Sequence, residues 1–177
     1  MIQIAPSILS ADFAYLARDI EKIATADWVG YIRSRFEATG KSIPAELAEE
    51  ICRRVDNHSS YVQQLAWLVW TRTGKEATRQ ELEAAFQDII DQNTPLFEKQ
   101  TESLTSFQMN FLRAIIDGVH SEFTTQEVMR KYQLGSSANV SIIKRALIKK
   151  ELIEIDKRKA VIPDPIMKVW LKRELRM

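Results

Sequence analysis

Apolar residues recur every three or four positions along most of this chain, and that spacing restricts the fold to one built mainly of helices. The clearest segment follows a capping box of Thr78 and Glu81, because Leu82, Phe86 and Ile89 then fall on one stripe. Helices are expected at residues 12–26, 28–38, 106–117, 126–132, 138–150 and 166–175, and three more begin at Pro44, at Ser59 or Ser60, and at Thr78. Asn93-Thr94-Pro95 is expected to end the helix that begins at Thr78, because proline disrupts helices.

The last part of the chain has a distinct order of elements. Three helices, the second opened by a capping box of Thr124 and Glu127, precede two β-prone runs at residues 152–155 and 160–162. Three helices followed by a hairpin is the order of a winged helix. We therefore predict an all-α fold, mainly a helical bundle, with a C-terminal winged helix that carries a small β-hairpin. The expected domains are residues 1–28, 29–103 and 104–177.

Composition excludes several classes of protein. Apolar residues make up 45% of the chain, enough for a buried core. The single cysteine, Cys52, cannot form an internal disulfide, and with two histidines it cannot build a structural zinc site. The longest apolar run, residues 65–70, is far shorter than the roughly 20 residues that cross a membrane. No basic region precedes the apolar N-terminal stretch, so we expect a reduced, cytoplasmic protein with no membrane partner.

The charges are distributed unevenly along the chain. Residues 141–177 contain 11 lysines and arginines against five aspartates and glutamates, whereas residues 1–140 have an excess of five acidic residues. A basic end of this kind is typical of nucleic-acid binding, although a solvated basic face gives the same count.

The helix expected at residues 138–150 has one face that suits a DNA groove. When Val140, Ile143 and Leu147 turn inward, Ala138 and the candidate contact residues lie on the opposite face. The candidate nucleic-acid-binding residues are Ser141, Ile142, Arg145 and Lys149 on this face, and Lys157, Arg158 and Lys159 at the hairpin tip. Arginine can read guanine and lysine can bind phosphates, so double-stranded DNA is one expected partner. A protein partner is the alternative, because an exposed Ile142 also suits a protein contact.

Other prominent side chains have structural interpretations. Tyr61, Trp67 and Trp70 lie on one strongly apolar helix and are expected in the core, and Cys52 is expected to be a small buried hydrophobe. Pairs of opposite charge at i,i+4 spacing predict surface ion pairs, here Glu49 with Arg53 and Glu50 with Arg54.

Residues 2–28, IQIAPSILSADFAYLARDIEKIATADW, resemble the start of ribulose-phosphate 3-epimerase, a TIM-barrel family. The resemblance implies that Ser7 is the remnant of a sugar-phosphate site. It ends after Trp28, where the family has a His-x-Asp metal pair and this chain continues Val29-Gly30-Tyr31. A barrel also needs about 200 residues or more. Epimerase activity is therefore not expected.

Five later stretches, YIRSRFEATGKSI, VDNHSSYVQQLAWLVW, QNTPLFEKQTESLTSFQMNFLRAI, KYQLGSSANV and IPDPIMKVWLKR, resemble the C-terminal part of archaeal-type P-loop ATPases, which are AAA-related. The resemblance covers residues 29–177 and implies a helical lid followed by a winged helix. It also implies that His58 and Tyr61 lie near a nucleotide when an ATPase core is supplied. The family often has His-Pro-Tyr-Tyr where this chain has His58-Ser59-Ser60-Tyr61.

The sequence lacks the motifs that bind the phosphates and the magnesium ion of ATP in P-loop enzymes. It contains no Gly-x-x-x-x-Gly-Lys-Ser/Thr phosphate loop and no acidic pair at a strand end for magnesium. We therefore expect no enzyme activity, no cofactor and no metal. The expected function is that of a lid and winged-helix portion of an ATPase-like protein, acting as a DNA-binding or regulatory module with a P-loop core or another protein as partner. A protein–protein interaction module and an inactive epimerase fragment are the alternatives.

Overall fold

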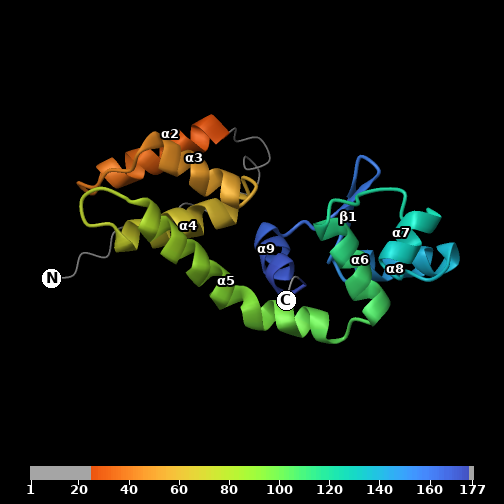
Figure 1. The fold of residues 1–177 in the computed structure, drawn as a ribbon. Helices are drawn as coiled ribbons and strands as arrows, with labels where there is room; N and C mark the ends of the chain where they lie inside the picture. The colour runs from red at the N-terminus through yellow and green to blue at the C-terminus, as the bar shows by residue number, and fades with distance from the viewer. Residues whose placement is uncertain (1–24, 176–177) are drawn as a thin grey trace. The chain divides into compact units, whose positions relative to one another are not determined.

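A computed structural model describes residues 25–175, which form eight helices and one two-stranded hairpin (Figure 1). The chain divides into two compact units, one ending at Asp88 and one beginning at Ile89, which we call unit 1 and unit 2. The boundary falls inside helix α5 (Arg79–Glu102), so this helix contributes to both units. The expected fold class, helical with a small hairpin near the C-terminus, is confirmed. Ser7 and most of the helix expected at 12–26 lie outside the described residues.

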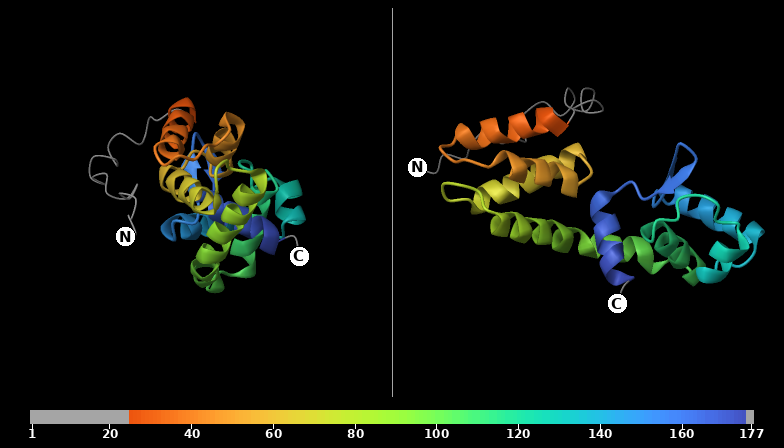
Figure 2. Two further views of the ribbon diagram at one scale, coloured as in Figure 1. Left: turned by 90° about the vertical axis from the view of Figure 1, so that its left-hand side faces the viewer. Right: turned by 45° about the horizontal axis from the view of Figure 1, so that its top comes forward.

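Unit 1 is a helical bundle. Helix α2 (Thr25–Glu37) packs against α3 (Ala45–Arg54) and α4 (Ser59–Arg72), as the second view of Figure 2 shows. Helix α2 already begins at Thr25, so the break expected between residues 26 and 28 does not occur. The fully buried side chains of this unit include Ile32, Phe36, Ile51, Leu65 and Leu82.

The apolar helix α4 turns one of its tryptophans outward. Its buried stripe passes through Val62, Leu65 and Val69, which leaves Trp67 on the opposite side with 49% of its surface exposed. The expectation that Trp67 lies in the core is therefore wrong, and Tyr61 and Trp70 are only half-buried.

Cys52 on α3 is fully buried, as expected for a small hydrophobe, and this burial raises the pKa of its thiol to about 11.

Glu50 on α3 lies inside an arginine cluster instead of on the surface. Its side chain is 7% exposed, and it accepts hydrogen bonds from Arg54 Nε at 3.1 Å and Arg79 Nη1 at 3.1 Å. Arg54 also pairs with Glu83 of α5, so this cluster joins α3 to the beginning of α5. The expected Glu50–Arg54 pair exists, but its placement at the surface is wrong because Arg79 and Glu83 close over it.

Unit 2 holds the remainder of α5, followed by α6 (Ser106–Ile116), α7 (Gln126–Lys131), α8 (Ser137–Lys149), β1 (Glu154–Asp156), β2 (Lys159–Val161) and α9 (Pro165–Glu174). Helix α6 packs against both α8 and α9. Its core includes Phe111, stacked on Phe123 with ring centroids 4.2 Å apart, and the fully buried Leu112 and Leu147.

Helix α5 continues through the point where the sequence predicts its end. Asn93 Nδ2 donates to the carbonyl of Ile89, and Thr94 Oγ1 donates to that of Ile90. Pro95 lies inside the helix, and two residues later Phe97 is 1% exposed and packs on Trp170 of α9, with ring centroids 5.7 Å apart. Burial of Phe97 in unit 2 thus outweighs the local cost of a proline within the helix.

Polar side chains cap most helix starts. The capping box of Thr78 and Glu81 is present, with Thr78 N donating to Glu81 Oε2 at 2.7 Å. The cap of α7 is Thr125 instead of the expected Thr124, and its Oγ1 accepts from Val128 N. Because N3 is then Val128, this cap is a single hydrogen bond and not the expected box with Glu127.

Candidate nucleic-acid interface

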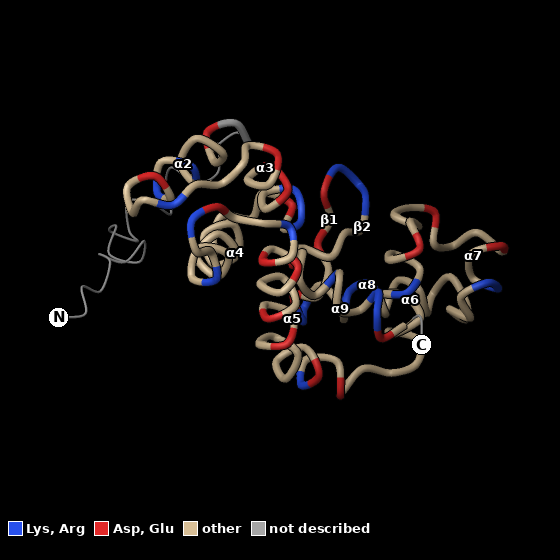
Figure 3. Tube along the Cα trace, turned by 60° about the vertical axis from the view of Figure 1, so that its left-hand side comes forward, with Lys and Arg blue, Asp and Glu red and all other residues tan. Residues whose placement is uncertain are grey.

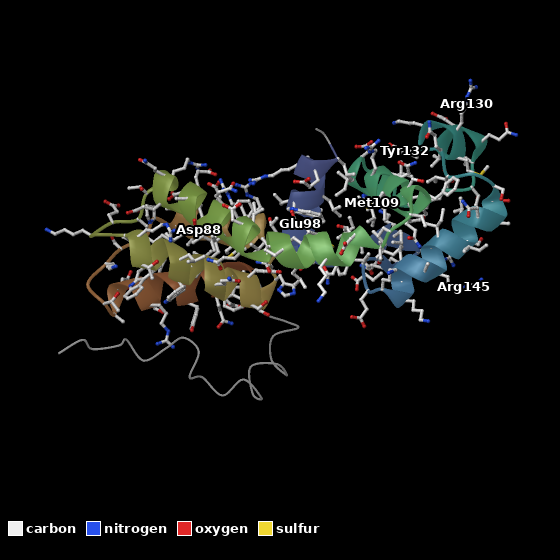
Figure 4. All side chains as sticks on the ribbon, turned by 90° about the horizontal axis from the view of Figure 1, so that it is seen from below. Asp88, Glu98, Met109, Arg130, Tyr132 and Arg145 are labelled. Atoms are coloured by element: carbon white, nitrogen blue, oxygen red, sulfur yellow. The ribbon has the colours of Figure 1, made fainter. Side chains whose placement is uncertain are left out.

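Helix α8 has the inward and outward faces that its sequence predicts. Val140, Ile143 and Leu147 are buried, and Ile142 is 61% exposed. Ser141, Arg145 and Lys149 are exposed too, and Figure 4 marks Arg145 on the outer side of this helix. One face of α8 therefore combines an aliphatic side chain, a hydroxyl and two cations.

The turn between α7 and α8 is locked by one side chain of α8. Asn139 Nδ2 donates to the carbonyl of Leu134 at 2.7 Å, and Ser136 Oγ caps the helix by accepting from Asn139 N. Gly135 between them has a φ of +78°, and a Cβ at this position would meet Asn139 Nδ2 at 3.0 Å. These contacts fix the start of α8, where Ser141 and Ile142 lie within its first two turns.

The hairpin ends in a two-residue turn made of two basic residues. The register pairs Asp156 with Lys159, so Lys157 and Arg158 form the loop, and both have positive φ, 45° and 71°. Such turns favour Asn-Gly, because residues with a larger side chain rarely adopt this conformation. The consecutive cations Lys157, Arg158 and Lys159 appear as a continuous blue segment at the hairpin tip (Figure 3).

The candidate cations are not neutralised by neighbouring carboxylates. Arg145, Lys149 and the three cations of the hairpin tip form no ion pair with any residue between 25 and 175. Glu50 and Arg79 of unit 1, by contrast, form an ion pair at 2.8 Å. The charges on α8 and the hairpin are thus free to meet an external anion.

Two further cations on α7 were not singled out from the sequence. Arg130 and Lys131 are exposed, and with Gln126 and Glu127 they line a hollow on this short helix; Figure 4 marks Arg130 at its outer side. The sequence signal that could have suggested them is two adjacent cations at the end of the helix that precedes α8.

The two residues expected near a nucleotide lie together in unit 1. His58 precedes the first turn of α4, with its Nδ1 3.0 Å from Ser60 Oγ and its ring centroid 5.0 Å from that of Tyr61. His58 is exposed. Among the residues between 25 and 175 there is no group of three or more His, Cys, Asp or Glu side chains that could hold a metal ion. Within the same range, none of the helices has the length and apolar content needed to cross a membrane.

Comparisons with known proteins agree with this arrangement. Residues 95–173 match a family model described as a probable winged helix domain. Among solved structures, the chain is similar to a Walker-type ATPase of Pyrococcus abyssi, with a TM-score of 0.67 and 15% sequence identity over 85% of this chain and 42% of that protein. The chain therefore spans less than half the length of that ATPase, and comparison with curated proteins finds no match. These findings identify residues 95–173 as a winged-helix region, in a fold shared with an archaeal ATPase-like protein.

Proposed function

We propose that unit 2 binds double-stranded DNA, with α8 in the major groove and the hairpin tip on the backbone or in the minor groove. The observation that carries this proposal is the exposed face of α8, whose cations, like those of the hairpin tip, have no carboxylate partner among residues 25–175. The match to a winged-helix family supports it, because such domains often place their third helix in the major groove.

Each residue of the interface has a distinct role in this proposal. Arg145 reads guanine through its O6 and N7 acceptors, and Ile142 contacts a thymine methyl group. Ser141 Oγ donates within the helix to the carbonyl of Ser137 at 3.3 Å, so its oxygen is left to accept from a base. Lys149 and the tip cations Lys157, Arg158 and Lys159 neutralise phosphates.

Fluorescence anisotropy with a mixed-sequence duplex tests the division of these roles. Arg145→Ala should weaken binding and reduce the preference between sequences, whereas alanines at Lys157, Arg158 and Lys159 should weaken binding to all sequences alike. A control with Arg33, Lys75 and Lys99 changed to alanine removes the same charge from exposed positions on other elements and should bind nearly as well as the unmodified chain. Equal losses in the control and the hairpin-tip variant would contradict the proposal.

One observation favours a protein partner instead of DNA. Ile142 is the most exposed of the large apolar side chains described, at 61%, and an aliphatic side chain at the centre of α8 also suits a protein contact. In that case Ile142→Asp abolishes association with the partner, and added salt has little effect on the association.

We further propose that residues 29–103 act as a lid for a P-loop ATPase core, with His58 and Tyr61 near the nucleotide. The structural likeness supports this, because it covers 85% of this chain and only 42% of the Walker-type ATPase. The test adds this chain to the nucleotide-binding part of that ATPase and measures ATP hydrolysis. Stimulation that is lost with His58→Ala supports the lid role, and no stimulation contradicts it.

A further inference from the structure

One residue in the segment between α6 and α7, His120, bonds to the middle of the second strand of the hairpin. Ala160 N donates to the carbonyl of His120 at 2.7 Å, and His120 Nδ1 lies 3.0 Å from the carbonyl oxygen of Ala160. Both backbone polar groups of Ala160, the middle residue of β2, therefore bond to His120. A single residue thus takes the place of a third strand beside β2.

The chemistry of this contact determines which ring nitrogen of His120 is the donor. A carbonyl oxygen can only accept, so Nδ1 of His120 must carry a proton and donate it. The contact is sheltered, because Ala160 is 1% exposed and His120 is half-buried. A side chain without a donor at the Nδ1 position would leave the Ala160 carbonyl buried without a partner.

The end of α6 places His120 where it can make this contact. Gly118 adopts a φ of +95° and donates to the carbonyl of Ile115, while Val119 N donates to the carbonyl of Ala114 at 2.9 Å. These two bonds form the Schellman motif that commonly ends a helix. His120 follows directly and is therefore held at a fixed position relative to α6.

The hairpin needs such an anchor. Each strand has three residues, all three residues of β1 are exposed, and the turn at Lys157 and Arg158 has an unfavourable backbone conformation. An isolated two-stranded hairpin is marginally stable in water. The bonds to His120 add a fixed point beside the buried Ala160 and so help to set the direction of the tip cations relative to α8.

We infer that His120 is a positioning residue, whose donated hydrogen bond to Ala160 holds the hairpin so that Lys157, Arg158 and Lys159 reach DNA at the same time as α8. This inference rests on the proposed DNA binding. It assigns a role in recognition to a histidine that touches no nucleic acid.

Three substitutions at one position separate the hydrogen bond from side-chain shape. His120→Asn keeps a donor, because asparagine Nδ2 is attached to Cγ as histidine Nδ1 is. His120→Leu has nearly the shape of asparagine but no donor, and His120→Asp places a second oxygen against the Ala160 carbonyl. Hydrogen exchange of the Ala160 amide, followed by NMR on the full chain, should accelerate by roughly 2- to 10-fold in the leucine variant and little in the asparagine variant. Backbone order parameters of residues 157–159 should fall in the leucine and aspartate variants only.

DNA affinity then tests whether this positioning serves binding. His120→Leu should weaken binding on the order of 3- to 10-fold and reduce its salt dependence, and His120→Asn should restore both. In a chain whose Lys157, Arg158 and Lys159 are already alanine, His120→Leu should have almost no further effect, because it acts through those cations.

Two results would overturn the inference. One is an ordered hairpin with unchanged Ala160 exchange in the leucine variant. The other is an equal loss of affinity whether or not the tip cations are present, which would indicate general destabilisation. If neither the unmodified chain nor any variant binds DNA, the proposed function is wrong. The NMR measurements still decide in that case whether His120 positions the hairpin.

Discussion

At the scale of single residues, neighbouring arginines affect the pKa of Glu50 more strongly than burial does. Burial on its own would raise its pKa, but the hydrogen bond from Arg54 and the charges of Arg54, Arg79 and Arg53 hold it below its ordinary value of 4.5. A carboxyl whose pKa is lowered on folding stabilises the folded state above its unfolded-state pKa, and this contribution disappears as the pH falls through the folded-state pKa.

Glu50→Gln should therefore destabilise unit 1 near neutral pH. The glutamine leaves Arg54 and Arg79 without their shared anion, and we expect a loss of about 1–3 kcal/mol in the free energy of unfolding. Urea unfolding at pH 7 measures it, and the difference from the unmodified chain should shrink as the pH falls below 4.5.

Glu49→Gln is the matched control, because Glu49 is the exposed neighbour on the same helix. It should change the free energy of unfolding by no more than about 0.5 kcal/mol. Equal effects of the two substitutions would contradict the claim that Glu50 stabilises unit 1 through its buried arginine cluster.

At the scale of elements, several helices end in Schellman motifs without glycine. Glu151 follows α8 with a φ of 58° and Gln133 follows α7 with a φ of 52°, and in each case the next residue bonds back into the helix. Between residues 25 and 175, glycine takes this helix-ending position at Gly40 and Gly118 alone.

Glu151→Gly should therefore stabilise unit 2, by about 1 kcal/mol, because glycine adopts positive φ without the steric cost of a side chain. Glu151→Ala removes the same side chain and keeps the strain, so it should not stabilise. Thermal unfolding of the two variants decides this. A higher Tm for the alanine variant than for the glycine variant would contradict the account.

The turn of the hairpin should show a conflict between stability and function. Replacing Lys157 and Arg158 by Asn and Gly suits the turn and should raise stability by about 1 kcal/mol, because both native residues have positive φ. The same change removes two phosphate-binding cations, so DNA affinity should fall. Thermal unfolding and anisotropy on one sample measure both effects, and changing the two residues to alanine should lower affinity without the gain in stability.

Sequence patterns predicted the elements of unit 2 well, because they depend on local signals. The spacing of Val140, Ile143 and Leu147 correctly identified the buried face of α8, and the interval between the β-prone runs located the hairpin. The misassigned features depend on partners distant in sequence. Phe97 needs Trp170 to keep α5 helical past Pro95.

Contacts with partners distant in sequence also account for the roles of residues that the sequence did not reveal. Glu50 is buried because Arg79 and Glu83, about 30 residues later, close over it. His120 has no motif of its own, and only the position of Ala160 beside it shows its contact. The roles of Ser141, Ile142, Arg145 and the hairpin cations stay predictions.

At the scale of the whole molecule, the chain joins a helical unit to a winged-helix unit and carries no phosphate loop in its sequence. We expect the purified chain to hydrolyse no ATP and to leave ribulose 5-phosphate unchanged, because its sequence contains neither a phosphate loop nor the His-x-Asp metal pair of the epimerases. Coupled assays of both reactions test this. Activity above a mock preparation that a point substitution removes would contradict it.

The salt dependence of DNA binding tests the central claim most directly. Four cations, Lys149 on α8 and the three at the hairpin tip, are offered to phosphates, and each contact contributes a slope of roughly −0.9 to log affinity against log salt. If most engage, the slope should be about −3 to −4, and alanines at Lys157, Arg158 and Lys159 should flatten it by roughly 2 to 3. Absence of binding at low salt, or a slope that the hairpin-tip alanines leave unchanged, would contradict DNA recognition by this winged helix.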